Sequence, residues 1–201
     1  MRLAIRFAAF ASLFALAAPA DAGKFNKTLS IGDAAPTWEG LEGTDGKKHA
    51  LADLKDSEVV VVVFTCNSCP VAEAYEDRII ALAKANPKAG LVAVNVNTGK
   101  DDALPAMKQR AAKKKFPFPY VFDPSQEVAR KYGAKFTPEF FVLNKDRKVV
   151  YMGAMDDKSP PADATVNFLE QAVAAAMAGK DAPAETLARG CKIRFNMKRD
   201  E

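Results

Sequence analysis

Apolar and polar residues follow one another along this chain in blocks whose spacing predicts alternating strands and helices. Val59–Phe64 is an unbroken apolar run rich in β-branched residues, which is typical of a central strand buried on both faces. Pro70 suits the first turn of a helix, and apolar residues recur at helical spacing through Val71–Ala85. Leu91–Val96 then predicts a second strand. A strand, a helix and a strand in this order predict a parallel pair with a right-handed crossover.

The rest of the pattern predicts a hairpin on each side of this unit and three more helices. Phe25–Leu54 is rich in turn residues, and Thr44-Asp45-Gly46-Lys47 marks a short hairpin. The elements expected downstream are a helix at Asp101–Lys115, an extended piece at Tyr120–Phe122, a short helix at Ser125–Tyr132 ended by Gly133, an antiparallel hairpin of Phe140–Leu143 and Val149–Met152, and an amphipathic helix at Ala164–Ala178. Together they predict an α/β fold with a central mixed sheet flanked by helices and an N-terminal hairpin extension.

The N-terminal segment has the pattern of a secretory signal. Arg2 and Arg6 give it a basic start, and the uncharged stretch Phe7–Ala20 precedes an A-x-A-like cleavage site before Gly23. This stretch has 14 residues, short of the roughly 20 needed to span a bilayer. An uncleaved membrane anchor is the alternative. We therefore predict a signal peptide at 1–22 and a protein located in the periplasm or secreted, where disulfides persist.

After the signal, the length fits one domain at 23–180, followed by a C-terminal tail at 181–201. The formal net charge of +4 is mild. The basic run Lys113-Lys114-Lys115 fits the C-terminal end of a helix, where cations complement the helix dipole. Since no aromatic or basic stripe accompanies this run, no nucleic-acid partner is expected.

Three cysteines carry the candidate chemistry. Cys66 and Cys69 come directly after the central strand and open the following helix, where the helix N-terminus favours a reactive thiolate. One alternative is an inert structural disulfide or a pair of core thiols. Another is a metal site, for example copper held by two thiolates and His49. Zinc usually needs four ligands, and the chain offers three cysteines, one histidine and no second C-x-x-C. Cys191 stands far away in the tail and leaves the count odd.

Either of the two cysteines could be the attacking thiol. With Pro70 at the first helical position, Cys69 would be the N-cap of the helix and the better nucleophile. Simple C-x-x-C numbering would instead make Cys66 the attacking thiol and Cys69 the resolving one. We favour Cys69, and in either case the pair should interconvert between a dithiol and a disulfide.

Several segments resemble one family. They are Gly46–Asp53, Val63–Pro70, Thr137-Pro138, Met155–Asp157 and Gly190–Ile193. The chain resembles the thioredoxin fold, and more closely the exported redoxins of the alkyl hydroperoxide reductase/thiol-specific antioxidant group. The resemblance covers roughly Ile31–Gly179 and implies a thioredoxin-like domain.

The resemblance also implies roles for particular residues. Cys69, five residues after Phe64, falls at the position of the thioredoxin nucleophile. Thr137 and a cis Pro138 would face the cysteines and bind an extended substrate through exposed backbone. The resemblance does not assign a role to Cys191, which is a candidate additional redox thiol, a buried structural thiol or a site of intermolecular pairing. Expected partners are protein or small-molecule disulfides and dithiols and an unidentified electron donor or acceptor, with no cofactor and no bound metal.

Three functions remain open from the sequence. The first is an exported thiol–disulfide oxidoreductase, and the second is a copper- or partner-binding module on the same fold. The third is a thiol peroxidase, whose Pro-x-x-x-Thr-x-x-Cys pattern is missing here because Val62 and Cys66 stand where the Pro and Thr would precede Cys69. Glu139, beside the proline, is expected to be a solvated charge rather than a substrate contact.

Overall fold

A mixed sheet forms the centre of the protein in the computed structural model, which describes residues 23–158, 163–181 and 185–196. The predicted signal peptide lies outside the described residues. The seven strands are ordered β2-β1-β5-β4-β3-β7-β8. Their bounds are β1 Leu41–Gly43, β2 Lys48–His49, β3 Val59–Phe64, β4 Ala89–Asn95, β5 Tyr120–Phe122, β7 Glu139–Leu143 and β8 Val149–Gly153. A separate two-stranded sheet pairs β6, Phe136–Thr137, with β9, Cys191–Lys192.

Strand directions confirm the predicted mixed sheet. β3 pairs with β4 in parallel from Val59↔Ala89 to Phe64↔Val94, and β5 continues the parallel part. β7 runs antiparallel to β3 and forms the predicted hairpin with β8. The short β1–β2 hairpin adds the expected extension at the other edge. Because the two cysteines follow β3, they emerge at its carboxyl end, near the middle of the sheet.

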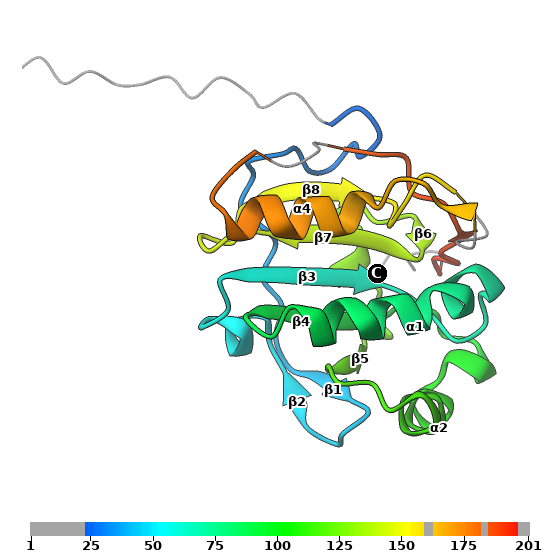
Figure 1. Cartoon of the computed structure of the whole chain (residues 1–201). Helices are drawn as coiled ribbons and strands as arrows, with labels where there is room; N and C mark the ends of the chain where they lie inside the picture. The colour runs from blue at the N-terminus through cyan, green and yellow to red at the C-terminus, as the bar shows by residue number, and fades with distance from the viewer. Residues whose placement is uncertain (1–22, 159–162, 182–184, 197–201) are drawn as a thin grey trace, which may run out of the picture.

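Helices cover the two faces of the sheet unequally. They are α1 Pro70–Ala85, α2 Leu104–Lys114, α3 Glu127–Tyr132 and α4 Phe168–Met177, with 3-10 turns η1 Leu51–Leu54 and η2 Lys100–Asp102. In β3, Val59, Val61 and Val63 pack with side chains of α1, α2 and α4, and Figure 1 shows α1 and α4 in front of the sheet. The alternate residues Val60, Val62 and Phe64 pack behind it with α3, η1 and Trp38. The β3 run is therefore apolar throughout because both of its faces are buried.

Three predicted helices begin later than expected, and the shortest of them, expected from Ser125, is α3 and starts at Glu127. In place of a helix from Asp101, η2 is followed by the extended residue Ala103, and α2 starts at Leu104 with Pro105 in its first turn. The helix expected from Ala164 starts at Phe168, where the side chain of Asn167 accepts a hydrogen bond from the Glu170 N–H at 3.3 Å. Within the described ranges, no helix is both long and apolar enough to cross a bilayer.

Buried acidic side chains fix α1, the helix that carries Cys69, to its neighbours. Glu76 accepts two hydrogen bonds from Arg110 of α2, at 2.8 and 3.0 Å. Asp156, after β8, is buried and pairs with Arg78, while the Tyr75 hydroxyl donates to it at 2.8 Å. These contacts hold both sides of α1, so the N-terminus of the helix has a defined place above the sheet.

Candidate active site

The N-terminus of α1 positions Cys69. As Pro70 predicted, Cys69 is the N-cap residue, with φ −93° and ψ 114°, and its sulfur accepts a hydrogen bond from the Ala72 N–H at 3.4 Å. A sulfur at this place faces the positive end of the helix and one of its free N–H groups. Both effects stabilise a thiolate at Cys69.

Thr137 lies against both cysteines. The Cys69 sulfur lies 3.1 Å from the Thr137 carbonyl oxygen, to which it donates when it is protonated, and the Cys66 sulfur lies 3.4 Å from the Thr137 hydroxyl. The bond between Thr137 and Pro138 is cis, as the family resemblance implied. Cys66 and Cys69 are each only 2% exposed, and both thiols are free. The structure thus brings together four of the predicted site residues around two buried sulfurs.

The two thiols have pKa values that move in opposite directions. The pKa of Cys69 lies well below its ordinary value, chiefly because the Cys66 thiol hydrogen-bonds to it, and burial only partly opposes this. The pKa of Cys66 is raised, first by the same hydrogen bond with Cys69 and then by burial. The pair therefore holds one thiolate at Cys69 and one thiol at Cys66, which is the division of charge that a nucleophile and a resolving thiol need.

This division predicts the pH dependence of Cys69. Because its pKa is lowered, Cys69 keeps its thiolate as pH falls below the ordinary thiol value of about 8.5. Replacing Cys66 by alanine removes the main cause, so the pKa should rise and alkylation by iodoacetamide near pH 6 should slow. Cys66→Ser retains a hydroxyl donor and should shift the rate less. The measurement is the pH profile of Cys69 alkylation by peptide mapping; an identical midpoint in Cys66→Ala and the parent protein would contradict this assignment.

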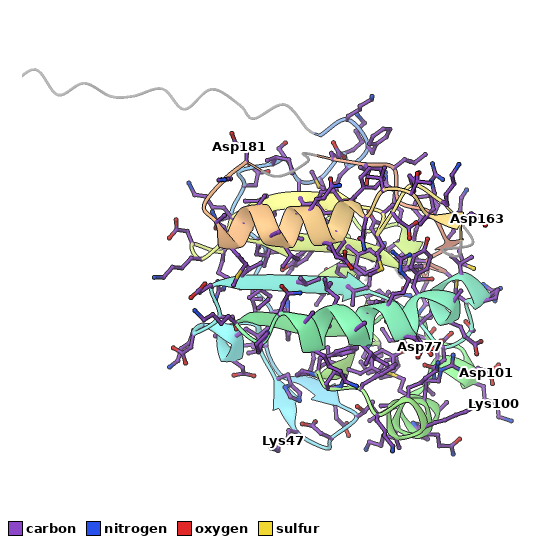
Figure 2. The ribbon with its side chains drawn as sticks, in the orientation of Figure 1. Lys47, Asp77, Lys100, Asp101, Asp163 and Asp181 are labelled. Atoms are coloured by element: carbon purple, nitrogen blue, oxygen red, sulfur yellow. The ribbon has the colours of Figure 1, made fainter. Side chains whose placement is uncertain are left out.

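A buried carboxylate that the sequence did not single out holds the loop between the cysteines. Asp102 of η2 is 3% exposed and accepts from the Asn67 N–H at 2.7 Å and the Ser68 N–H at 3.1 Å. It also accepts from the Ser68 hydroxyl at 2.6 Å. The neighbouring Asp101 is exposed, and Figure 2 shows it with Lys100 on the outside near the start of α2. Asp102 therefore holds the two residues between the cysteines, and a lone Asp in a predicted helix carries no sequence signal for that role.

The third cysteine, Cys191, also lies at this site, through a strand pairing that the sequence pattern did not show. β9 pairs antiparallel with β6, with Cys191 opposite Thr137. Cys191 packs against the cluster of Cys66, Cys69 and Ala72, and burial together with the neighbouring Cys69 raises the pKa of its thiol. The backbone at Thr137, expected to bind an extended substrate, is therefore already paired with the protein's own C-terminal segment.

The expectation for Glu139 is wrong. Its side chain is 7% exposed rather than solvated, and one carboxylate oxygen accepts from the N–H groups of Lys135 and Phe136 at 2.7 and 3.0 Å. Burial raises the pKa of this carboxyl. Glu139 thus shapes the turn that presents Thr137, because it satisfies two backbone donors before the Thr137-Pro138 bond.

The residues considered for a metal do not converge. His49 belongs to β2, where its Nε2 lies 3.0 Å from Asp45 across the hairpin turn. In the parts of the chain that the structure describes, no group of three or more His, Cys, Asp or Glu side chains could hold a metal ion. The donor set proposed for copper, two thiolates and His49, is not assembled around Cys66 and Cys69.

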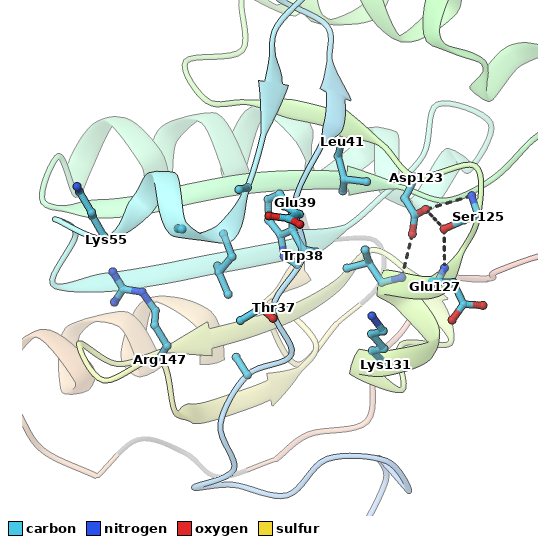
Figure 3. Close-up of a pocket in the computed structure, with 15 residues that line it drawn as sticks. Thr37, Trp38, Glu39, Leu41, Lys55, Asp123, Ser125, Glu127, Lys131 and Arg147 are labelled. Atoms are coloured by element: carbon cyan, nitrogen blue, oxygen red, sulfur yellow. Dashed lines mark hydrogen bonds between the residues drawn. The ribbon is translucent and has the colours of Figure 1, made fainter.

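A pocket of about 740 Å³ opens elsewhere, and none of the cysteines lines it. Figure 3 shows Asp123 and Ser125 on one side, Lys55 and Arg147 on the other, and Trp38 between them. Two of its charged groups bond to the backbone of the fold: Asp123 accepts from the Val128 N–H at 2.9 Å, and Arg147 donates to backbone carbonyls of the loops around it. The candidate chemistry therefore belongs to the buried cysteine cluster and not to this pocket.

The comparisons with known proteins found one family model and several solved structures that match the chain. A model of the AhpC/TSA family matches residues 31–152. Two solved structures with TM-scores of 0.78 and 0.77 are a hypothetical protein from Sinorhizobium meliloti 1021 and an uncharacterized conserved protein from Geobacillus kaustophilus. They are 30% and 32% identical; the matches cover 85% and 84% of this chain and 97% and 94% of theirs.

A third solved structure carries a functional name. It is a protein from Chlorobium tepidum assigned as the thiol:disulfide interchange protein DsbE, which is 30% identical with a TM-score of 0.58. The match covers 74% of this chain and 99% of that one. No curated protein matches the chain.

Proposed function

Because the chain belongs to the AhpC/TSA family of thioredoxin-like redox proteins, we propose that it is an exported thiol–disulfide oxidoreductase acting through Cys69 and Cys66. The observation that carries this proposal is the placement of Cys69 as the N-cap of α1, in one buried cluster with a second free thiol, Cys66. One activated thiolate beside one resolving thiol is the minimum apparatus for disulfide exchange.

The exchange proceeds in two displacements. The Cys69 thiolate attacks one sulfur of a substrate disulfide, forms a mixed disulfide with it, and releases the other sulfur as a thiolate. Cys66 then loses its proton and attacks the Cys69 sulfur, so that the Cys66–Cys69 bond forms and the second substrate thiolate leaves. The substrate gains two electrons and the protein pair loses two. The same steps in reverse oxidise a substrate dithiol.

Export is the second part of the proposal. The basic start, the short apolar stretch and the cleavage site in residues 1–22 support it. Disulfides persist outside the cytosol, where such a protein would meet protein or small-molecule disulfides and dithiols. An electron donor or acceptor of the same chemical class must return the Cys66–Cys69 pair to its starting state.

The experiment that tests this proposal is a redox titration of the mature chain, 23–201. The protein is equilibrated in glutathione and dithiothreitol buffers, trapped with an alkylating reagent and mapped by mass. A reversible Cys66–Cys69 couple between about −270 and −120 mV is expected, the range of known exchange proteins. A reduction potential below about −300 mV would indicate a structural disulfide and contradict the proposal.

Two further arms distinguish the alternatives in the same preparation. The reduced Cys66–Cys69 pair should be oxidised more slowly by hydrogen peroxide than by a disulfide substrate. Faster oxidation by peroxide would identify a peroxidase. Titration with copper(I) should give no stoichiometric complex. Tight one-to-one uptake that blocks thiol alkylation would favour a metal-binding module instead.

A further inference from the structure

We propose that Cys191 is an internal exchange partner of Cys69, held in the place of a substrate cysteine by the strand β9. This inference rests on the proposed function, because it assumes that Cys69 is the exchanging thiol. It adds a third thiol to the chemistry and assigns the edge beside Thr137 to the protein's own C-terminal segment.

The backbone register makes Cys191 resemble a bound substrate residue. β9 adds to the β6 edge as an extended antiparallel strand, with Cys191 opposite Thr137 and Lys192 opposite Phe136. The Thr137 hydroxyl also donates to the Cys191 carbonyl at 3.5 Å. Strand addition of this kind is how extended peptides bind to sheet edges. Here the added strand brings a sulfur to Cys69.

Residues on both sides of Cys191 hold the strand in this register. A Cβ on Gly190 would overlap the carbonyl of Thr137, so the close approach of the two backbones requires glycine. Beyond Cys191, Ile193 is buried and its N–H donates to the Lys135 carbonyl at 2.8 Å. The Gln126 amide then donates to the Arg194 carbonyl at 2.9 Å. β9 is therefore seated by its own contacts.

The three cysteines differ in their exposure to solvent. Cys66 and Cys69 are each 2% exposed, whereas Cys191 is only partly buried. Of the three residues, Cys191 is therefore the one most exposed to an external thiol or disulfide. The pKa of Cys191 is raised by burial and by its neighbour Cys69, whereas that of Cys69 is lowered. In a Cys69–Cys191 disulfide, Cys69 is the better leaving group, and attack falls on the accessible sulfur.

Cys191 can exchange with the Cys66–Cys69 disulfide without a net change in electrons. The Cys191 thiolate attacks the Cys69 sulfur of the Cys66–Cys69 disulfide; the Cys69–Cys191 bond forms, and Cys66 leaves and takes up the proton that Cys191 lost. No electron enters or leaves the protein in this step. An external thiolate then attacks the Cys191 sulfur and releases the Cys69 thiolate. A second external thiolate displaces Cys191, so two external thiols become one disulfide and the protein gains two electrons.

Tryptic mapping can detect the proposed bond directly. Cys66 and Cys69 lie in peptide 56–78, and Cys191 lies in peptide 190–192. In Cys66→Ser, mild oxidation with diamide should join these two peptides within one chain. The control is Cys191→Ser, in which the Cys66–Cys69 bond should still form inside peptide 56–78. If Cys191→Ser forms its bond but Cys66→Ser leaves the two peptides unlinked, this inference fails and the proposed function stands. If neither bond forms, the proposed function fails as well.

A second pair of variants tests the role of the strand without removing a sulfur. In the Cys66→Ser background, Gly190→Val should displace β9, because the new side chain would overlap Thr137. Formation of the Cys69–Cys191 bond should then slow by about tenfold or more, since Cys191 loses its high local concentration. Lys192→Ala, at an exposed position of the same strand, should leave the rate unchanged. Equal rates in the two variants would contradict the substrate-like seating of Cys191.

Discussion

Replacement of Cys69 by serine is expected to reduce disulfide exchange by about 10³-fold or more, the scale on which the loss of a nucleophile acts. The serine hydroxyl does not ionise near neutral pH, so no thiolate is left to attack a substrate disulfide at the helix N-terminus. The fold should survive, because serine is a preferred N-cap residue and can accept the Ala72 N–H that the sulfur now accepts. The measurement is turnover of a glutathione-coupled disulfide assay beside a thermal unfolding curve.

Two companion variants separate chemistry from structure. Cys69→Ala should be as inactive as Cys69→Ser, but it loses the cap and about 1 kcal/mol of stability. The double variant Cys66→Ser/Cys191→Ser keeps the nucleophile but removes both thiols that could resolve its adduct, so with a disulfide substrate it should accumulate mixed disulfides at Cys69. If Cys69→Ser kept most of the activity while Cys66→Ser lost it all, Cys66 would be the attacking thiol, as simple C-x-x-C numbering suggests.

Sequence reasoning succeeded where a feature depends on neighbouring residues. The apolar run Val59–Phe64 is β3 residue for residue, and Pro70 is the first residue of α1. The N-cap role of Cys69 follows from this one proline, because a helix that starts at Pro70 makes Cys69 its cap. The place of Thr137 against the cysteines came from the family resemblance and not from its spacing along the chain, since 68 residues separate it from Cys69.

The sequence did not reveal contacts made by single polar residues across long separations. Asp102 reaches back 35 positions to Asn67, and its sequence surroundings predicted only a helix. β9 has two residues, too few for an alternating pattern, and its register is set by contact with β6. Glu139 was expected to lie in solvent because charged residues usually do. It is buried instead, and two backbone N–H groups donate hydrogen bonds to its carboxylate. Such side chains position the reactive groups, so the least predictable residues are those that give the site its geometry.

This dependence on geometry leads to the second large effect, at Asp102. Asp102→Ala removes the acceptor of two backbone N–H groups and the Ser68 hydroxyl. Each hydrogen bond to a charged group is worth about 1.5–3 kcal/mol, and the donors left behind are partly buried, so we expect a loss of about 3 kcal/mol in unfolding free energy. Chemical denaturation measures this loss. The matched control is Asp101→Ala: its side chain is exposed, and only its backbone carbonyl binds Asn67, so the effect should stay within about 0.5 kcal/mol.

A readout beyond stability identifies Asp102 as a positioning residue for the cysteines. The charge of Asp102 contributes to the raised pKa of Cys66, after the hydrogen bond with Cys69 and burial. Asp102→Asn keeps an acceptor oxygen for the loop but removes the charge, so the pKa of Cys66 should fall and its alkylation should begin at lower pH. If Asp102→Asn left the alkylation profile of Cys66 unchanged, Asp102 would act on the fold alone. If Asp102→Ala were as stable as Asp101→Ala, the carboxylate would not hold the loop between the two sulfurs at all.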